Sequence, residues 1–436
     1  MLSPMAITPR VEIENPGSSA PPHVVVIGAG FAGLAATREL ANTNVRVTIV
    51  DQHNYHTFLP LLYQVATAGL EPADVAYPVR TIFGHARNVT FRHGRVRSID
   101  HDRRVVVLDD RSEITFDHLV LATGATAAYF AIPGASQFAM PLYSLADARH
   151  LRNRLLIELE AADVQRENGA SELNFVVVGG GPTGVETSGA LAELIDIVVR
   201  RDGLDFGAIK VRVILVDLAA QLLTTFPKSA GRYARQALSD RGVEVQFGRS
   251  VVEVEERAIR FADGERLETA AVIWAAGVTV AGTLADELST PTGANGRVLV
   301  TPELRVAGRS GVWAVGDAAA VLSGGKLCAQ LAPVAIQSGH HCAQQILHVE
   351  AGQATSPFHY RDKGTMATIG RNAAVASLPG HVVIKGRLGW MAWLTLHLFY
   401  LIGFRNRLRV VINWTWRYFD WPSGPRLIVA DAETVD

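Results

Sequence analysis

Two stretches of the chain show the same order of apolar, glycine-rich and acidic positions. In the first, the apolar run HVVVI begins at His23, and a glycine turn and a helix-like segment lead to the run VRVTIVD, which ends at Asp51. In the second, NFVVV begins at Asn174 and leads in the same way to VRVILVD, which ends at Asp217. Short runs of Val, Ile and Leu bounded by glycine are typical of buried strands in parallel sheets. Each stretch therefore predicts a strand, a glycine turn, a helix, a second strand and a terminal carboxylate.

The glycines of both stretches have the spacing G-x-G-x-x-G, which is typical of a dinucleotide-binding turn. The first glycine permits the tight bend, the second lets the backbone approach a pyrophosphate, and the third lets the helix pack on the strand. The carboxylate at the end of the second strand is placed to accept hydrogen bonds from a ribose diol. One copy is also an ordinary strand-to-helix turn, but two complete copies indicate two dinucleotides. These glycines are Gly28, Gly30 and Gly33 in the first copy and Gly179, Gly181 and Gly184 in the second.

Three further apolar runs are expected to end near these turns. FDHLVLATG, residues 116–124, and AVIWAAG, residues 271–277, each end in small residues that let the backbone pass close to a cofactor. GVWAVGD, residues 311–317, follows the second unit and ends in the carboxylate of Asp317. This order is expected if the second nucleotide unit is inserted into the first, so that the chain returns to the first unit after completing the second. Asp317 would then lie beside the ribityl and pyrophosphate groups of a flavin. The alternative for Asp317 is a turn or helix-cap residue.

The C-terminal part of the chain has a different pattern. The 17 residues from Leu388 to Phe404, LGWMAWLTLHLFYLIGF, carry no formal charge unless His397 is protonated, and a membrane-spanning helix needs about 17 to 25 residues. Residues 385–417 contain six Lys and Arg residues, no Asp or Glu, and tryptophans at positions 390, 393, 414 and 416. Basic and indole side chains favour a segment that lies on an anionic lipid surface. A buried helix pair or a dimer interface is the alternative.

Composition is typical of an α/β protein with two or three domains. The chain has 436 residues, of which 48% are hydrophobic and 39 are glycine. The formal net charge of −1 gives no general attraction to nucleic acid. Two cysteines, Cys328 and Cys342, favour reduced thiols over a disulfide framework. Residues 1–22 lack the continuous apolar core of a secretory signal, so we expect them to form a mobile tail.

Four segments resemble the type II NADH:quinone dehydrogenase family. They are NYHTFLPLLYQVATAGLEPADVA from Asn54, VVVGGGPTGVETSGALAEL from Val176, VWAVGDAA from Val312 and YRDKGTMATIGRNAAVA from Tyr360. The resemblance implies a respiratory-chain enzyme that does not pump protons, with FAD on the first unit, NADH on the second and a membrane quinone as the acceptor. It also implies a monotopic homodimer, which we expect on the cytoplasmic face of the cell membrane because NADH is made there. We expect no metal, because the cysteines and histidines form no metal-ligand cluster.

The cofactor positions follow from matches to the segments of this family. Gln64 lies in the PLLYQVA loop, which resembles the flavin-ring loop of the family. A carboxylate at Asp217 would also repel a 2′-phosphate, so NADH is favoured over NADPH. The residues expected to bind FAD are Gly28, Gly30, Gly33, Asp51, Gln52, Gln64, Val96, Thr123, Gly124 and Asp317. The residues expected on the NADH side are Gly179, Gly181, Gly184, Asp217 and Gly277.

Three more residues are expected near the reacting groups. Glu186 resembles a glutamate that the family places near the nicotinamide and flavin, although a first-turn acid that interacts with the helix dipole is the alternative. Lys363 resembles a residue near the quinone pocket, where an ammonium would stabilise charge on a reduced flavin or quinone oxygen, and a solvated lysine is the alternative. The AQxAIQ segment of the family is APVAIQ here, so Pro333 replaces the first glutamine and Gln337 remains. This departure affects the expected quinone site and not the flavin site.

These patterns divide the chain into five segments. Residues 1–22 form the tail, 23–145 the first part of the FAD unit, 146–289 the NADH unit, 290–385 the second part of the FAD unit, and 386–436 the segment for membrane association and dimerisation. The residues alone also allow a soluble or peripheral NADH-dependent flavin reductase with another acceptor. A membrane-tethered sensor that binds flavin and NADH without turnover is a further alternative. A sulfide:quinone reductase is disfavoured, because it requires redox cysteines at the flavin.

Overall fold

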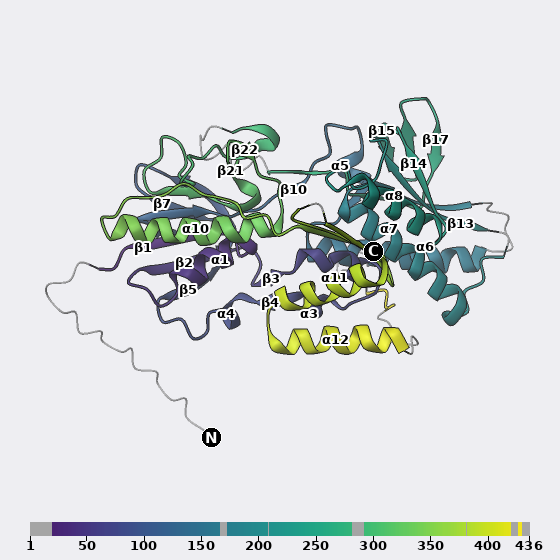
Figure 1. Ribbon diagram of the computed structural model, residues 1–436, viewed down its shortest axis with the longest axis horizontal. Helices are drawn as coiled ribbons and strands as arrows, with labels where there is room; N and C mark the ends of the chain where they lie inside the picture. Colours follow the sequence, from purple (N-terminus) through teal and green to yellow (C-terminus); the bar gives the residue numbers. More distant parts are fainter. Residues whose placement is uncertain are drawn as a thin grey trace, which may run out of the picture.

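The computed structural model describes residues 20–165, 172–207, 209–280, 292–380, 382–419 and 426–429, without the side chains of residues 165, 201, 202 and 416–419. Two α/β units lie side by side, and a pair of C-terminal helices lies below their junction (Figure 1). The expected α/β class, with two Rossmann-like units and a helical C-terminal segment, is confirmed. Residues 1–19 of the predicted tail lie outside the described part, as does the side chain of Trp416.

The first unit is built on a parallel sheet with the strand order β20-β9-β1-β2-β5. Its strands are β1 (His23–Ile27), β2 (Arg46–Asp51), β5 (Val89–His93), β9 (His118–Leu121) and β20 (Val312–Ala314). Ile27 is in register with Val50 on one side and Leu121 on the other, and Leu121 is in register with Ala314. The strands therefore end at one edge of the sheet. β20 joins this sheet after the second unit, which is the return of the chain that the sequence predicts.

Helices α1 (Phe31–Leu40) and α10 (Ala332–Glu350) pack closely on each other in the first unit. Gly339 of α10 permits this contact, because a Cβ there would overlap the carbonyl group of Ala32 in α1. Strand β1 is buried along its whole length, as expected for a parallel sheet that is covered on both faces. The helix α1, which follows the first glycine turn, is therefore held between the sheet and α10.

The second unit repeats this arrangement with the strand order β11-β18-β12-β13-β14. Its strands are β11 (Ala139–Pro141), β12 (Glu172–Val178), β13 (Lys210–Asp217), β14 (Val243–Phe247) and β18 (Ala271–Trp274). Val178 is in register with Val216 and with Trp274, so these strands also share one edge. β11 pairs in this sheet, whereas the sequence assigned it to the first unit. The short run of β11 carries no glycine pattern that would mark a change of unit.

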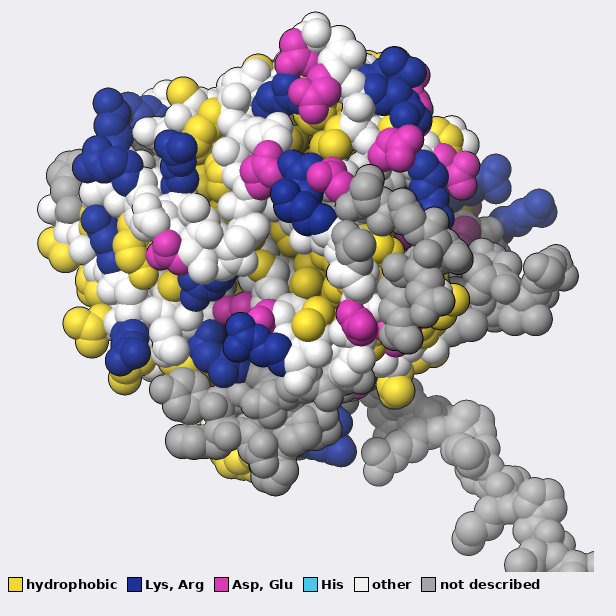
Figure 2. Space-filling view, turned by 90° about the vertical axis from the view of Figure 1, so that its right-hand side faces the viewer, with side chains coloured by type: hydrophobic (Ala, Val, Ile, Leu, Met, Phe, Trp, Pro, Cys, Tyr) yellow, Lys and Arg dark blue, Asp and Glu magenta, His cyan; other side chains and the backbone are white. Residues whose placement is uncertain are grey.

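The end of the second unit that faces away from the first carries basic and acidic side chains interspersed (Figure 2). Ion pairs of this unit include Arg260 with Glu253 and Glu255, and Arg266 with Glu255. A surface on which both signs of charge alternate produces no large field of one sign. This face therefore has no general attraction for polyanions.

Three antiparallel strands and two helices form a C-terminal unit. They are β23 (Thr365–Gly370), β24 (Ala373–Leu378), β25 (Val382–Lys385), α11 (Gly386–Tyr400) and α12 (Phe404–Phe419). β23 packs on α7 (Pro182–Ile197) of the second unit, and β24 packs on α11. A Cβ on Gly189 of α7 would overlap the carbonyl group of Ile369 in β23, so glycine permits this contact. Residues 365–385, which the sequence assigned to the FAD unit, therefore pack on the second unit and on α11.

The apolar run of residues 388–404 does not form a single helix. α11 ends at Tyr400, Leu401 has an extended backbone with φ −64° and ψ 131°, and Gly403 has a φ of +86°. A Cβ on Gly403 would overlap the ring of Tyr77, so contact with the body of the protein defines this turn. Within the described ranges, no helix combines the length and the apolar character that crossing a membrane requires.

The remaining elements connect the units. The helices are α2 (Leu62–Ala66), α3 (Pro72–Val75), α4 (Val79–Ile82), α5 (Ala135–Phe138), α6 (Leu145–Gln165) and α8 (Lys228–Ser239). The three-stranded antiparallel sheets are β6 (Val96–Asp100), β7 (Val105–Leu108) and β8 (Glu113–Thr115), and β15 (Val251–Glu255), β16 (Ala258–Phe261) and β17 (Arg266–Glu268). The ribbons are β3 (Tyr55–Thr57) with β4 (Ala76–Pro78), β10 (Thr126–Ala127) with β19 (Val278–Thr279), and β21 (Leu322–Ser323) with β22 (Lys326–Leu327).

Candidate active site

The first glycine turn joins β1 to α1 and has the geometry of a phosphate cradle. Gly28 has a φ of +105°, and a Cβ on it would overlap the carbonyl group of Ala122. A Cβ on Gly33 would overlap the carbonyl group of Gly28, so the helix can approach the strand only with glycine here. A Cβ on Gly30 would meet no atom within 4 Å. The N-terminus of α1 therefore has room for a pyrophosphate, which its free N–H groups favour.

The second glycine turn, between β12 and α7, repeats this geometry. Gly179 has a φ of +111°, and a Cβ on it would overlap the carbonyl group of Ala275. A Cβ on Gly184 would overlap the carbonyl group of Gly179, whereas a Cβ on Gly181 would meet no atom within 4 Å. Both turns therefore fit a dinucleotide for the same steric reasons.

The carboxylates of the last residues of β2 and β13 hold these turns in place. Asp51 accepts hydrogen bonds from the backbone N–H groups of Ala29, at 2.6 Å, and His53, at 2.7 Å. Asp217 accepts one from Gly180 and one from Ala219. Each carboxylate therefore connects the end of its strand to the glycine turn, a contact that the sequence did not predict. The carboxylates remain partly exposed, which fits a contact with a ribose.

The other predicted FAD residues follow the ends of neighbouring strands in the first sheet. Thr123 and Gly124 follow β9, and Gly124 has a φ of +73°. Asp317 follows β20, and burial raises the pKa of its carboxyl to about 6, although the nearby charge of Arg297 lowers it. Burial, and then the charge of Asp317, raise the pKa of Tyr143 in the second unit to about 12. Asp317 therefore lies close to the boundary between the two units.

Gln52 and Val96 lie at the opposite end of this row of residues. The carbonyl oxygen of Gln52 is 2.9 Å from Nε2 of His93, at the end of β5. Val96 begins β6 and packs against the core of the first unit. Because the strand order is β20-β9-β1-β2-β5, the predicted FAD residues form a row from Asp317 across the glycine turn to Asp51 and Gln52. A row of this kind fits an extended dinucleotide.

Gln64 is engaged in contacts with the C-terminal unit. Its amide Nε2 donates to the hydroxyl of Tyr63 at 2.8 Å, and its Oε1 accepts from the indole of Trp414 at 3.0 Å. Gln64 therefore connects α2 to α12. Its role at the flavin ring stays a prediction.

Gly277 lies where the two units meet. It follows β18 and has a φ of +149°. Its carbonyl accepts from the N–H of Ala128 at 3.0 Å and from the hydroxyl of Tyr143 at 3.4 Å. The adjoining residues form β19, which pairs with β10. A nucleotide on the second unit would therefore approach the row of residues that ends at Asp317.

Glu186 lies in α7, shortly after the second glycine turn. Its Oε1 accepts a hydrogen bond of 3.2 Å from the backbone N–H of Thr368 in β23. Burial raises the pKa of Glu186 to about 8, although this hydrogen bond and the nearby indole N–H of Trp393 lower it. The carboxyl is therefore mainly neutral at pH 7. It lies where the second unit meets the C-terminal unit.

Gln337 and Lys363 belong to two segments that the structure brings together. Nε2 of Gln337 donates to the carbonyl of Arg361 at 3.0 Å, and the N–H of Arg361 donates to Oε1 of Gln337 at 3.0 Å. Lys363, two residues further on, is exposed. Pro333 lies in the first turn of α10. Gln330, which precedes it, donates to the carbonyl of Asp317 at 3.1 Å.

A pocket that the sequence did not predict lies beneath the C-terminal helices. It is lined by residues of α2, α7, β23, α11 and α12, among them Gln64, Thr368, Trp390, Trp393 and Trp414. Neither Gln337 nor Lys363 lines it. The sequence identified these tryptophans as interfacial rings, but it carries no local signal that α2 and α12 approach each other.

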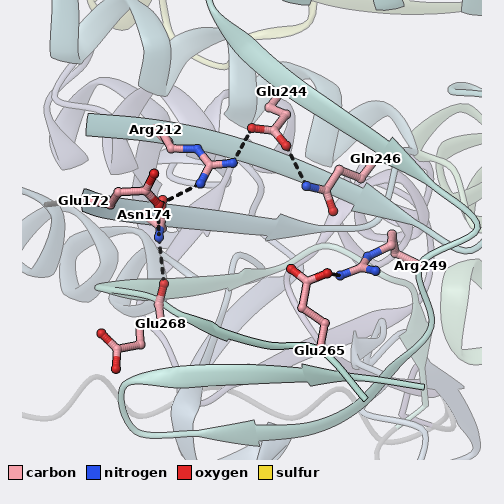
Figure 3. A network of polar contacts seen from close by, with 8 residues as sticks. All are labelled: Glu172, Asn174, Arg212, Glu244, Gln246, Arg249, Glu265 and Glu268. Atoms are coloured by element: carbon pink, nitrogen blue, oxygen red, sulfur yellow. Dashed lines mark hydrogen bonds and ion pairs between the residues drawn. The ribbon is translucent and has the colours of Figure 1, made fainter. Parts of the chain in front are cut away.

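Charged groups around the second sheet bear on the choice of nucleotide. Arg212 pairs with Glu172 and Glu244 (Figure 3). It lies near the beginning of β13, whereas Asp217 is the last residue of this strand. The backbone N–H of Arg249 donates to the carbonyl of Asp217, but its side chain pairs with Asp263 and Glu265. The charge of Asp217 is therefore not offset by either guanidinium, which disfavours a 2′-phosphate.

The two cysteines have no arrangement that suggests redox chemistry. Both are free thiols, and Cys342 is fully buried in the core of the first unit. Burial raises the pKa of the Cys342 thiol, which disfavours the reactive thiolate. Among the described residues, no group of three or more His, Cys, Asp or Glu side chains is arranged to hold a metal ion.

Comparisons with known proteins agree with this geometry. The pyridine nucleotide-disulphide oxidoreductase family matches residues 22–339, and the NDH2 C-terminal domain matches residues 363–420. The structure of NDH2 from Plasmodium falciparum in complex with NADH superimposes with a TM-score of 0.83 at 18% identity, and covers 93% of this chain and 100% of that chain. This match shows a common fold.

Two relatives from Mycobacterium tuberculosis are more similar in sequence. The type II NADH:quinone oxidoreductase Ndh is 36% identical over 425 residues, which are 94% of this chain and 90% of the relative. The type II NADH:quinone oxidoreductase NdhA is 38% identical over 408 residues, which are 90% of this chain and 86% of the relative. With both nucleotide turns, the NDH2 C-terminal domain and this similarity in place, the chain belongs to the type II NADH:quinone oxidoreductases of the pyridine nucleotide-disulphide oxidoreductase family.

Proposed function

We propose that this protein oxidises NADH through bound FAD and reduces a membrane quinone without pumping protons. The observation that carries the proposal is the pair of matching glycine turns, whose nucleotides would meet at the boundary marked by Asp317 and Gly277. The relatives from Mycobacterium tuberculosis are named for NADH:quinone oxidoreductase activity. When bound, FAD supplies the chemistry, because it takes a hydride from NADH and passes electrons to the acceptor.

The residues of this chain would hold the two nucleotides and shield the reaction. The glycine turns and the carboxylates of Asp51 and Asp217 fit one dinucleotide on each unit, with FAD on the first and NADH on the second. Neutral Glu186 places no negative charge near the reacting groups. Lys363 would stabilise negative charge that develops on a quinone oxygen, and Gln337 positions the loop that carries it.

We further propose that the C-terminal helices bind an anionic lipid surface. α12 turns polar side chains toward the protein, because Asn406 donates to the carbonyl of Ala76 and Asn413 donates to Asp74. Its other side exposes Phe404, which is 80% accessible, and Phe399 at the end of α11 is 69% accessible. Apolar side chains on the outside, with basic residues nearby, are typical of a helix that lies in a membrane surface. The homodimer and the cytoplasmic face rest on the family resemblance and on where NADH is made.

Matched variants of the two open glycines test the assignment of the nucleotides. A Cβ on Gly30 or Gly181 would meet no atom within 4 Å, so a valine there extends into the open space that a pyrophosphate needs. We expect Gly30→Val to weaken FAD binding by more than about tenfold, or about 1.4 kcal/mol. We expect Gly181→Val to retain FAD while its reduction by NADH requires more than about tenfold higher NADH. Flavin absorbance of the purified proteins, with and without NADH, distinguishes them. The opposite pattern would reverse the assignment.

The rate at which NADH reduces the flavin should depend on the ionisation of Glu186. Its pKa of about 8 keeps the carboxyl neutral below pH 8 and negative above it, and negative charge disfavours a reduced flavin nearby. We expect a rate that is about tenfold lower at pH 9 than at pH 7, because about one carboxyl in ten stays neutral one unit above its pKa. The side chain of the Glu186→Gln variant cannot ionise, so its rate should be the same at pH 9 as at pH 7. Anaerobic stopped-flow absorbance measures both rates, and the same fall in the variant would assign it to another group.

Charged substitutions on the C-terminal helices test the membrane surface. The double variant Phe399→Glu and Phe404→Glu should lower partitioning onto phosphatidylcholine and phosphatidylglycerol vesicles by at least about 100-fold, since each buried Phe contributes about 1.5 to 3 kcal/mol. The control is Ile157→Glu and Val164→Glu on α6, whose side chains are also exposed. Vesicle sedimentation measures the bound fraction. Equal losses in both double variants would contradict a binding surface on α11 and α12.

A further inference from the structure

His397 is a half-buried residue of α11 to which the proposed reaction has so far assigned no role. Its Nδ1 lies 2.8 Å from the carbonyl oxygen of Trp393, one turn earlier in the helix. A carbonyl oxygen only accepts, so Nδ1 carries the proton and Nε2 has a free lone pair. Burial lowers the pKa of His397 to about 4, which keeps the ring neutral. Nε2 has no hydrogen-bond partner among the described residues, and the ring retains some accessible surface.

Ring contacts connect His397 to the first nucleotide unit. Its ring lies 6.1 Å from the ring of Phe58, edge to face, and Phe58 lies 5.8 Å from Phe31. Phe31 is the first residue of α1 and directly follows Gly30 of the FAD cradle. Two ring contacts therefore separate His397 from the first glycine turn.

Contacts on the other side connect His397 to the second unit. Its ring stacks on that of Trp393, with centroids 4.0 Å apart and an interplanar angle of 23°. Trp393 is 1% exposed, and its indole N–H lies near enough to Glu186 to lower the pKa of that carboxyl. Glu186 is the fifth residue of α7, which follows the second glycine turn. His397 therefore lies between the N-terminal parts of α1 and α7, the helices that follow the two glycine turns.

We propose that His397 binds the acceptor, and that its free Nε2 accepts a hydrogen bond from a hydroxyl group of the reduced quinone, the hydroquinone. The inference rests on the proposed function. A neutral ring with Nδ1 engaged can only accept at Nε2, so it pairs with a hydroxyl and not with the carbonyl oxygen of the oxidised quinone. It therefore favours the product form of the acceptor.

A hydroxyl of the ribityl chain of bound FAD would be an alternative donor of the same chemistry. The acceptor is favoured because His397 belongs to the helix that exposes Leu388, Met391 and Phe399 on its outer side. Trp393, on which it stacks, also lines the pocket beneath α11 and α12. A lipophilic ring in this pocket would contact Trp393, the residue on which His397 stacks.

The test compares a short-chain hydroquinone with its dimethyl ether, which has the same ring and no hydroxyl. Isothermal titration calorimetry under anaerobic conditions, on the FAD-loaded protein without NADH, measures both dissociation constants. We expect His397→Phe, which keeps the ring, to bind the hydroquinone about fivefold more weakly and the ether unchanged, as for one neutral hydrogen bond. His397→Gln, whose amide oxygen accepts, should restore most of the difference. The control His341→Phe changes a half-buried histidine of α10 that contacts the carbonyl of Ser356, and should leave both constants unchanged.

Each other outcome has a distinct meaning. Equal weakening of hydroquinone and ether in His397→Phe would show that the ring only fills space, and would overturn the proposal. Loss of bound FAD from His397→Phe, measured as flavin per protein, would place Nε2 on the ribityl chain and overturn it as well. Failure of the unmodified protein to bind either the quinone or the hydroquinone would contradict the proposed function itself.

Discussion

Both nucleotide turns depend on one steric constraint, the close approach of a helix to the turn that precedes it. In each unit the third glycine lies so near the carbonyl group of the first that a Cβ would overlap it, as at Gly33 and Gly184. The approach directs the free N–H groups of the helix toward the space beside the second glycine. The carboxylates of Asp51 and Asp217 then hold the turns by hydrogen bonds to their backbone. The close approach of the helix to the turn therefore provides both the space for a pyrophosphate and the N–H groups that would bind it.

The C-terminal unit connects this machinery to the side from which an apolar acceptor would come. Gly189 of α7 lets β23 approach closely, and β23 in turn provides the N–H that donates to Glu186. α11 packs on β24 and places Trp393 and His397 beside the same junction. The elements that expose apolar side chains to the outside are therefore the ones that contribute side chains to the proposed acceptor site.

The sequence predicted what depends on short stretches of chain and missed what depends on distant contacts. Both glycine turns and the return of β20 followed from local patterns, because backbone geometry and strand ends require particular residues there. The break between α11 and α12 could not be predicted from a local pattern, because it is defined by the contact between Gly403 and Tyr77, which are far apart in the chain. The placement of β23 on α7 and the bond from Trp414 to Gln64 likewise join segments far apart in the chain. The pocket beneath the helices is assembled from such contacts.

In the proposed reaction, one bound flavin is reduced from the second unit and reoxidised by an acceptor from the membrane side. Anaerobic stopped-flow absorbance of the FAD-loaded protein tests it, with NADH mixed first and a short-chain quinone second. We expect the visible flavin band to disappear with NADH and to return promptly with quinone. A band that disappears and does not return with any quinone would leave an NADH-reducible flavoprotein and contradict the account of the acceptor. A band that NADH leaves unchanged would contradict the account of both units.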